Sequence, residues 1–255
     1  RASSRRSRPG PMAGATYLAE YADEVCQSWI TYAWLTGRSR GKELILANLT
    51  KMERTLFDAS MTKEWDNWKN FKAVTVVTGK EAKELLEKAK PIPSRWVHTN
   101  KNEFDPKLPM QAKSRLVAVG CYESVHVRTD SPTSSLLVFH LICSTAARKH
   151  WPLTKLDATS AYLQGDDVDR MLVLRPPSPL PPGVEQGSVF ICHGAIYGTK
   201  DAGGKWWSKL RRTLRDNSWQ ESRLERAFFL LFENGKLVGL VGTYVDDLFA
   251  TGNPD

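Results

Sequence analysis

The segment 227–252 constrains the fold of this chain more than any other stretch of the sequence. It contains AFFLLFENGKLVGLVGTYVDDLFATG, in which apolar and β-branched residues flank Asn234-Gly235 and then flank Asp246-Asp247. An Asn-Gly pair between two such runs is a strong local signal for a tight β-hairpin. We therefore expect two consecutive hairpins, with the two adjacent carboxylates at the tip of the second one.

Composition limits the class of protein. A chain of 255 residues can bury a sizeable core, and its net charge of +8 and pI near 9.3 favour an anionic partner, most commonly nucleic acid. Four scattered cysteines at 26, 121, 143 and 192 lack zinc-finger spacing and indicate inert thiols in a reducing compartment. The longest apolar run, residues 136–147, suits a core helix and is too short to span a membrane.

The rest of the sequence alternates between helical and β-rich patterns. Ser131 followed by Pro132 predicts the start of a helix over residues 131–150. Other helical patterns cover 17–58, 61–71 and 203–219. In the last of these, Trp206, Leu210 and Leu214 are expected to face inward. Short strands are expected at 74–77, 95–99, 114–120, 153–157, 171–177 and 188–198. Helices mixed with antiparallel hairpins predict an α+β fold.

Asp246 and Asp247 carry the clearest chemical signal. Two carboxylates a few ångström apart repel each other, so they tend to share a proton or a divalent cation. The alternative is an ordinary turn rich in Asp. Asp157 ends the expected strand 153–157, where an acid could also cap the following turn. Together the three acids suit a two-metal site for in-line displacement, and an all-oxygen site favours magnesium or manganese.

Seven motifs in order resemble the reverse transcriptase domain of copia-type long-terminal-repeat retrotransposons. YVDD at 244–247 matches the catalytic hairpin of that family, and LDATSAYLQG at 156–165 matches its other catalytic segment. The resemblance covers about residues 55–252 and continues through EWDNW, SRWVHTNKN, AKSRLVAVG, DSPTSSLLVFHLICSTAA and IYGTKDAGGKWW. It implies the fingers and palm of a right-hand polymerase, with an antiparallel palm sheet.

The resemblance also implies roles for residues near the carboxylates. Asp157, Asp246 and Asp247 would form the catalytic triad and bind two magnesium ions, with manganese as an alternative, and the backbone carbonyl of Ala158 would add a ligand. Tyr162 occupies the position of an aromatic steric gate that excludes a ribose 2′-hydroxyl; the alternative is a core aromatic.

Several basic residues match positions that contact the nucleotide or the nucleic acid. Lys113 and Arg115 stand in the fingers strand of the family, and the guanidinium of Arg115 suits a triphosphate; charges on an edge strand are the alternative. Basic residues of the 203–219 helix could face template–primer phosphates or simply solvent: Lys205, Lys209, Arg211, Arg212 and Arg215.

One tract departs from the family pattern. The family usually has KQAPR where this chain has KDAGG at 200–204, so Asp201 replaces a glutamine beside the incoming nucleotide. A carboxylate there should repel a triphosphate unless a metal or Lys200 compensates it. The sequence leaves open whether nucleotide binding is impaired.

These observations together predict an RNA-directed DNA polymerase. We expect a basic, disordered segment and helical connector over 1–54 and the polymerase domain over 55–255, ending after the catalytic hairpin without a thumb. The substrates would be deoxynucleotides and a primed RNA or DNA template, and no contact with a membrane is expected. The location of the protein stays open between a cytoplasmic particle and the nucleus. The alternatives are an inactive nucleic-acid-binding remnant and, disfavoured by the ordered motifs, another palm-fold enzyme such as a nucleotide cyclase.

Overall fold

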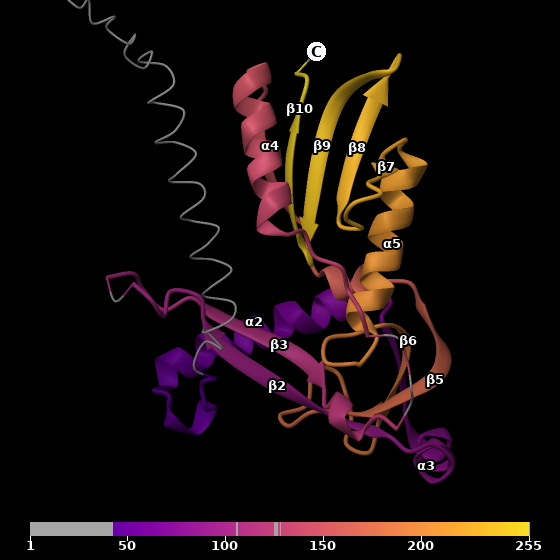
Figure 1. The fold of residues 1–255 in the computed structure, drawn as a ribbon. Helices are drawn as coiled ribbons and strands as arrows, with labels where there is room; N and C mark the ends of the chain where they lie inside the picture. Colours follow the sequence, from indigo (N-terminus) through magenta and orange to yellow (C-terminus); the bar gives the residue numbers. More distant parts are fainter. Residues whose placement is uncertain (1–42, 106, 125–126, 128, 255) are drawn as a thin grey trace, which may run out of the picture.

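The computed structural model describes residues 43–254 except 106, 125–126 and 128. The basic segment at 1–16 and most of the helical pattern over 17–58 therefore lie outside the described residues. Within the described part of the chain, the strands form two five-stranded sheets (Figure 1). Three short 3-10 turns connect larger elements: η1 (Leu46–Asn48), η2 (Gly120–Tyr122) and η3 (Ala161–Gln164).

The first sheet follows the order β1-β6-β5-β2-β3 and mixes one parallel pair, β2 with β5, with antiparallel ones. Helix α2 packs against β3 and buries Trp65 and Trp68 in the core of the first sheet. Helix α3 covers the β1–β6 side through Ala82. The bounds are α2 (Lys51–Asn70), β1 (Val74–Val77), α3 (Gly79–Lys88), β2 (Ile92–Asn100), β3 (Ala112–Ala118), β5 (Asp167–Arg175) and β6 (Val189–Gly194).

The second sheet follows the order β4-β10-β9-β8-β7 and is antiparallel throughout. Asn234 and Gly235 both have positive φ in the two-residue turn between β8 and β9, which confirms the first expected hairpin. The bounds are α4 (Leu136–Lys149), β4 (Leu153–Asp157), α5 (Ala202–Asp216), β7 (Gln220–Glu221), β8 (Phe228–Glu233), β9 (Lys236–Tyr244) and β10 (Asp247–Gly252).

The two faces of the second sheet are covered by different helices (Figure 1). Phe249 packs with Val138 and Ile142 of α4, whereas the adjacent Leu248 packs with Trp206 of α5. Successive residues of a strand point to opposite faces, so Asp247 shares the α4 face with Phe249. The catalytic-site candidates on β4 and β10 therefore lie on the face of the sheet opposite to α5.

The predicted start of the helix at Ser131 is wrong. Helix α4 begins at Leu136 with Ser135 as its N-cap, whose hydroxyl accepts a hydrogen bond from the backbone of Val138 at 3.4 Å. The preceding residues are held by tertiary contacts: the Ser134 backbone N–H donates to the carbonyl of Thr243 at 2.8 Å. Pairing with β9 thus keeps the segment extended and outweighs the local helix-start signal.

The predicted domain boundary between residues 54 and 55 falls inside α2. That helix begins with a capping box between Thr50 and Glu53 and continues without a break to Asn70, so it joins two patterns that we expected to be separate. Leu46 also packs against the core of the first sheet. No helix among the described residues combines the length and apolarity needed to cross a bilayer.

Candidate functional site

Two of the predicted carboxylates meet across paired strands. β4 and β10 run antiparallel with Asp157 directly opposite Asp247. β9 and β10 pair Tyr244 with Asp247, so the two-residue turn consists of Val245 and Asp246. This corrects the expectation that both Asp246 and Asp247 form the tip, because Asp247 is already the first residue of β10. All three predicted acids are nevertheless grouped at one end of the sheet.

The turn between β9 and β10 is held by hydrogen bonds to its main chain. The backbone N–H of Ala158 donates to the carbonyl of Asp246 at 2.8 Å, which ties the end of β4 to the turn. The indole N–H of Trp206 donates to the carbonyl of Val245 at 2.6 Å. Val245 has φ +56°, an unfavourable conformation for a β-branched residue. Contacts from α5 and β4 thus stabilise a strained turn that carries Asp246.

The electrostatics of the carboxylates match their proximity. Desolvation raises the pKa of Asp246 above its ordinary value, and the negative charges of Asp247 and Asp157 raise it further, while Arg115 opposes the shift. Asp247 is only 4% exposed, and its Oδ1 lies 3.2 Å from Nζ of Lys155. Lys155 precedes Asp157 by two residues on the same face of β4, and the sequence analysis missed it although strand periodicity could have indicated it.

The donor set fits a hard divalent cation in its chemistry. Carboxylate oxygens are the ligands that magnesium and manganese prefer, and the repulsion that raises the pKa of Asp246 is what such an ion would relieve. Among residues 43–254 as described, no three acidic, His or Cys side chains converge in metal-binding geometry. The side chains of the triad would have to turn toward a common ion, and Asp247 would have to exchange Lys155 for it.

Tyr162 and the two basic residues of β3 lie within electrostatic range of the same turn. Burial raises the pKa of Tyr162, and the charge of Asp246 raises it further while Arg115 lowers it. Burial lowers the pKa of Lys113, with Arg115 and Lys101 acting in the same direction and Glu64 and Asp246 opposing. The structure therefore brings Tyr162, Lys113 and Arg115 toward Asp246 from η3 and β3.

Tyr197 is a further aromatic side chain at this site that the sequence analysis did not single out. Its ring lies 5.2 Å from that of Tyr162 in an edge-to-face arrangement. Burial is the main cause that raises the pKa of Tyr197 to about 12, with contributions from Glu64 and Asp246. Tyr197 stands in the IYGTKDAGG tract, but its pairing with Tyr162 depends on a turn 35 positions away.

Asp201 is compensated by a residue that we did not predict. Arg170 holds its carboxylate with two hydrogen bonds, at 2.5 and 3.1 Å, and also pairs with Glu123. Asp201 and Glu123 are both at most 5% exposed. Lys200 instead donates from Nζ to the backbone carbonyl of Glu123 at 2.7 Å. The partner of Asp201 is thus Arg170 rather than Lys200.

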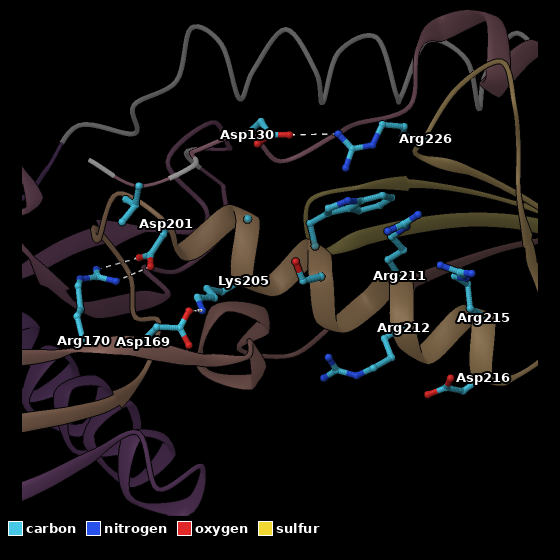
Figure 2. A pocket seen from close by; sticks show the side chains of 14 residues that line it. Asp130, Asp169, Arg170, Asp201, Lys205, Arg211, Arg212, Arg215, Asp216 and Arg226 are labelled. Carbon is cyan, nitrogen blue, oxygen red and sulfur yellow. Dashed lines mark hydrogen bonds and ion pairs between the residues drawn. The ribbon is translucent and has the colours of Figure 1, made fainter. Parts of the chain in front are cut away.

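A groove of about 1070 Å³ runs along α5 (Figure 2). Lys205 and Arg212 line it, but both are paired with carboxylates, of Asp169 at 2.7 Å and of Asp166 at 2.5 Å. Lys209 is exposed and does not line this groove. Of the five basic residues predicted to face nucleic acid from this helix, all but Lys209 line the groove.

Comparison with known proteins identifies the family of this chain. A family model described as reverse transcriptase (RNA-dependent DNA polymerase) matches residues 81–254, which include the three acids, Tyr162, Lys113 and Arg115. Two curated relatives are the retrovirus-related Pol polyproteins from transposons RE1 and RE2 of Arabidopsis thaliana, each 30% identical over 164 residues. The match covers 62% of this chain and 11% of each relative, so the chain spans a small part of their length. The chain belongs to the reverse transcriptase (RNA-dependent DNA polymerase) family, as a domain of the retrotransposon type.

Proposed function

We propose that the chain carries the catalytic centre of an RNA-directed DNA polymerase that adds deoxynucleotides to a primer 3′-hydroxyl on an RNA or DNA template. The observation that carries this proposal is the direct pairing of Asp157 with Asp247 beside Asp246 in the adjoining turn. The three acidic residues thus lie at the same end of the antiparallel sheet, on β4, on β10 and in the turn before β10.

Asp157, Asp246 and Asp247 act as the metal ligands in this proposal, with the backbone carbonyl of Ala158 as an additional donor. Two bound magnesium ions, or manganese in their place, would activate the 3′-hydroxyl and neutralise the leaving pyrophosphate. The chain itself holds the carboxylates in position through the β4–β10 pairing and through Trp206 at the turn. Lys155 keeps the charge of Asp247 balanced until that carboxylate turns to its ligand role.

The basic residues of β3 and the paired tyrosines form the nucleotide pocket. Arg115 suits the triphosphate because a guanidinium can hold two phosphate oxygens at once, and Lys113 adds a second positive charge. Tyr162 acts as the gate that excludes a 2′-hydroxyl, with Tyr197 supporting its ring. Asp201 does not repel the triphosphate in this arrangement, because Arg170 neutralises it. Lys200, beside Asp201 in the same tract, donates from Nζ to the backbone carbonyl of Glu123 and would contribute to the pocket from there.

The fold follows the same division. In this proposal the antiparallel sheet β4-β10-β9-β8-β7 with α4 and α5 is the palm, and the mixed sheet with α2 and α3 is the fingers. The second candidate function is nucleic-acid binding without catalysis. One observation favours it: Lys155 lies 3.2 Å from Asp247, where a catalytic cation would have to compete.

Primer extension separates the two candidates. The chain is incubated with magnesium, deoxynucleotides and a primed RNA template, next to its Asp246→Asn variant. Polymerase function predicts primer extension by the unaltered chain and loss of extension in Asp246→Asn. Binding of the primed template without extension by either protein would favour the non-catalytic candidate, and extension that survives Asp246→Asn would refute the site assignment.

A further inference from the structure

The groove along α5 is larger than a site for one small anion. An adjoining cavity of about 510 Å³ shares Arg211 and Arg215 with it, so the hollow continues past these two side chains. From Lys205 to Arg215 the helix advances about 15 Å, at 1.5 Å per residue. A hollow of that length suits several units of an extended polymer better than a single phosphate.

Arginines line the groove from two sides (Figure 2). Arg211 and Arg215 project from α5, and Arg226 lies opposite, where it pairs with Asp130 at 3.2 Å. Arg211 pairs with Glu221 at 2.5 Å, whereas Arg215 has no acidic partner within 4 Å among the described residues. Guanidinium groups bind phosphate oxygens in a fixed fork, so this set is suited to a chain of phosphates.

Trp207 provides an independent sign of a missing ligand. Its side chain lines the groove and is only 4% exposed, yet its indole N–H has no hydrogen-bond partner among the described residues. A buried donor without an acceptor is rare in folded proteins and calls for an explanation. The guanidinium of Arg226 lies 5.9 Å from the centre of this indole. The unpartnered donor therefore belongs to a side chain that both lines the groove and lies against Arg226.

The groove is separate from the catalytic turn. The α5 face of the sheet carries Leu248, whereas Asp247 shares the opposite face with Phe249. A strand bound along α5 is therefore not the primer end that the three carboxylates would engage. A positively charged groove that follows the backbone is one feature of proteins that bind single strands without sequence preference.

We propose that this groove binds the phosphate backbone of single-stranded nucleic acid. Arg211, Arg215 and Arg226 contact phosphates, and the indole N–H of Trp207 donates to one of them as Arg226 leaves Asp130. The inference deepens the proposed function and rests on it for the class of ligand. The proposed binding surface differs from the helix face predicted from the sequence. That face included Lys209, which does not line the groove.

The experiment measures binding of a fluorescein-labelled 20-nucleotide oligo-dT or oligo-U by anisotropy, without magnesium or deoxynucleotides, over a range of salt concentrations. Arg215→Gln and Arg226→Gln should each weaken binding about tenfold and reduce the slope of log Kd against log salt by about 0.7, the value for one lost phosphate contact on a single strand. Trp207→Phe should weaken binding about fivefold, as the loss of one hydrogen bond does, with no fall in Tm because the unpartnered N–H is removed.

Lys83→Gln on α3 is the charge-matched control, since Lys83 is exposed and remote from the groove. It should leave the salt slope unchanged. Groove variants that bind like the unaltered chain, or a control that loses as much as they do, would overturn the proposal. Competition by free pyrophosphate at equal phosphate concentration would also overturn it, because the groove would then be a small-anion site.

Primer extension by the same proteins keeps the two proposals apart. Suppose that the groove variants lose single-strand binding and that the unaltered chain does not extend primers. The binding result would then support the groove proposal, and the extension result would contradict the proposed polymerase activity. Groove variants with normal single-strand binding, in a chain that extends primers, would refute this inference alone.

Discussion

Among single residues, Asp246 carries a charge that its surroundings in the fold disfavour. Its pKa lies above the ordinary value of 3.8, so the folded state disfavours its ionised form. The stability that protonated Asp246 contributes is complete below its unfolded pKa and is lost as the pH rises through the folded pKa. Asp246→Asn should therefore raise the free energy of unfolding at pH 7, and Tm with it. The gain should be less than about 1 kcal/mol, because the residue is exposed.

Thermal melts of both proteins between pH 3.5 and 8 check this prediction. The gain from Asp246→Asn should shrink toward pH 3.5, where the unaltered side chain carries its proton. Glu87→Gln on the exposed side of α3 serves as a control for removing one negative charge. A gain that is equal at all pH values would mean that the raised pKa of Asp246 is not its cause.

Tyr162 is the second residue whose role can be tested alone. Removing a ring that blocks the 2′-hydroxyl should increase ribonucleotide incorporation relative to deoxynucleotide incorporation by about tenfold or more in Tyr162→Val. Tyr162→Phe keeps the ring and should keep the discrimination. The ratio of incorporation rates with matched nucleotides checks both. Equal ratios in all three proteins would assign Tyr162 to the core it shares with Tyr197.

Between elements, the buried ion cluster of Arg170 joins β5, the segment after η2 and the start of α5. Arg170 pairs with Glu123 and Asp201, whose side chains are 3% and 6% exposed. Arg170→Met should lower the unfolding free energy by about 3–5 kcal/mol, because two carboxylates stay buried without a partner. Urea denaturation checks this value, and Arg212→Met, which breaks an exposed pair, should cost less than about 1 kcal/mol.

A compensating variant tests the cause of that loss. Adding Glu123→Gln and Asp201→Asn to Arg170→Met removes the uncompensated charges and should restore much of the stability. If the triple variant is no more stable than Arg170→Met, lost packing of the arginine stem is the dominant effect. The same comparison shows whether Arg170 is what makes an acid tolerable at position 201.

The strands and turns were the elements most open to prediction from the sequence. The Asn234-Gly235 turn and the strand 153–157 depend on local turn chemistry and period-two spacing, and the structure confirms both. The start of α4 depends on contacts of Ser134 and Ser135 with Thr243 and Glu225, about 90 to 110 positions away. A local helix-start rule has no access to such contacts, and so it selected Ser131.

For the whole molecule, some neighbours in the site could be predicted from the sequence and others could not. Asp157 is the last residue of β4 and Asp247 is the first of β10, so their positions at strand ends suggested that they are neighbours. Arg170 and Glu123 could not be, since their link to Asp201 crosses three separate segments and follows no repeat. Trp207 was missed because a pattern shows that a tryptophan is buried but not whether its N–H has a partner.

Also for the whole molecule, the proposed polymerase activity depends on one metal-dependent catalytic centre. It is tested most directly by the single-turnover rate of nucleotide addition as a function of magnesium concentration. We predict a rate that rises more steeply than first order for the unaltered chain, falls at least about 100-fold in Asp247→Asn, and is kept in Asp66→Asn, an exposed acid on α2. Unchanged magnesium dependence and rate in Asp247→Asn would contradict the account.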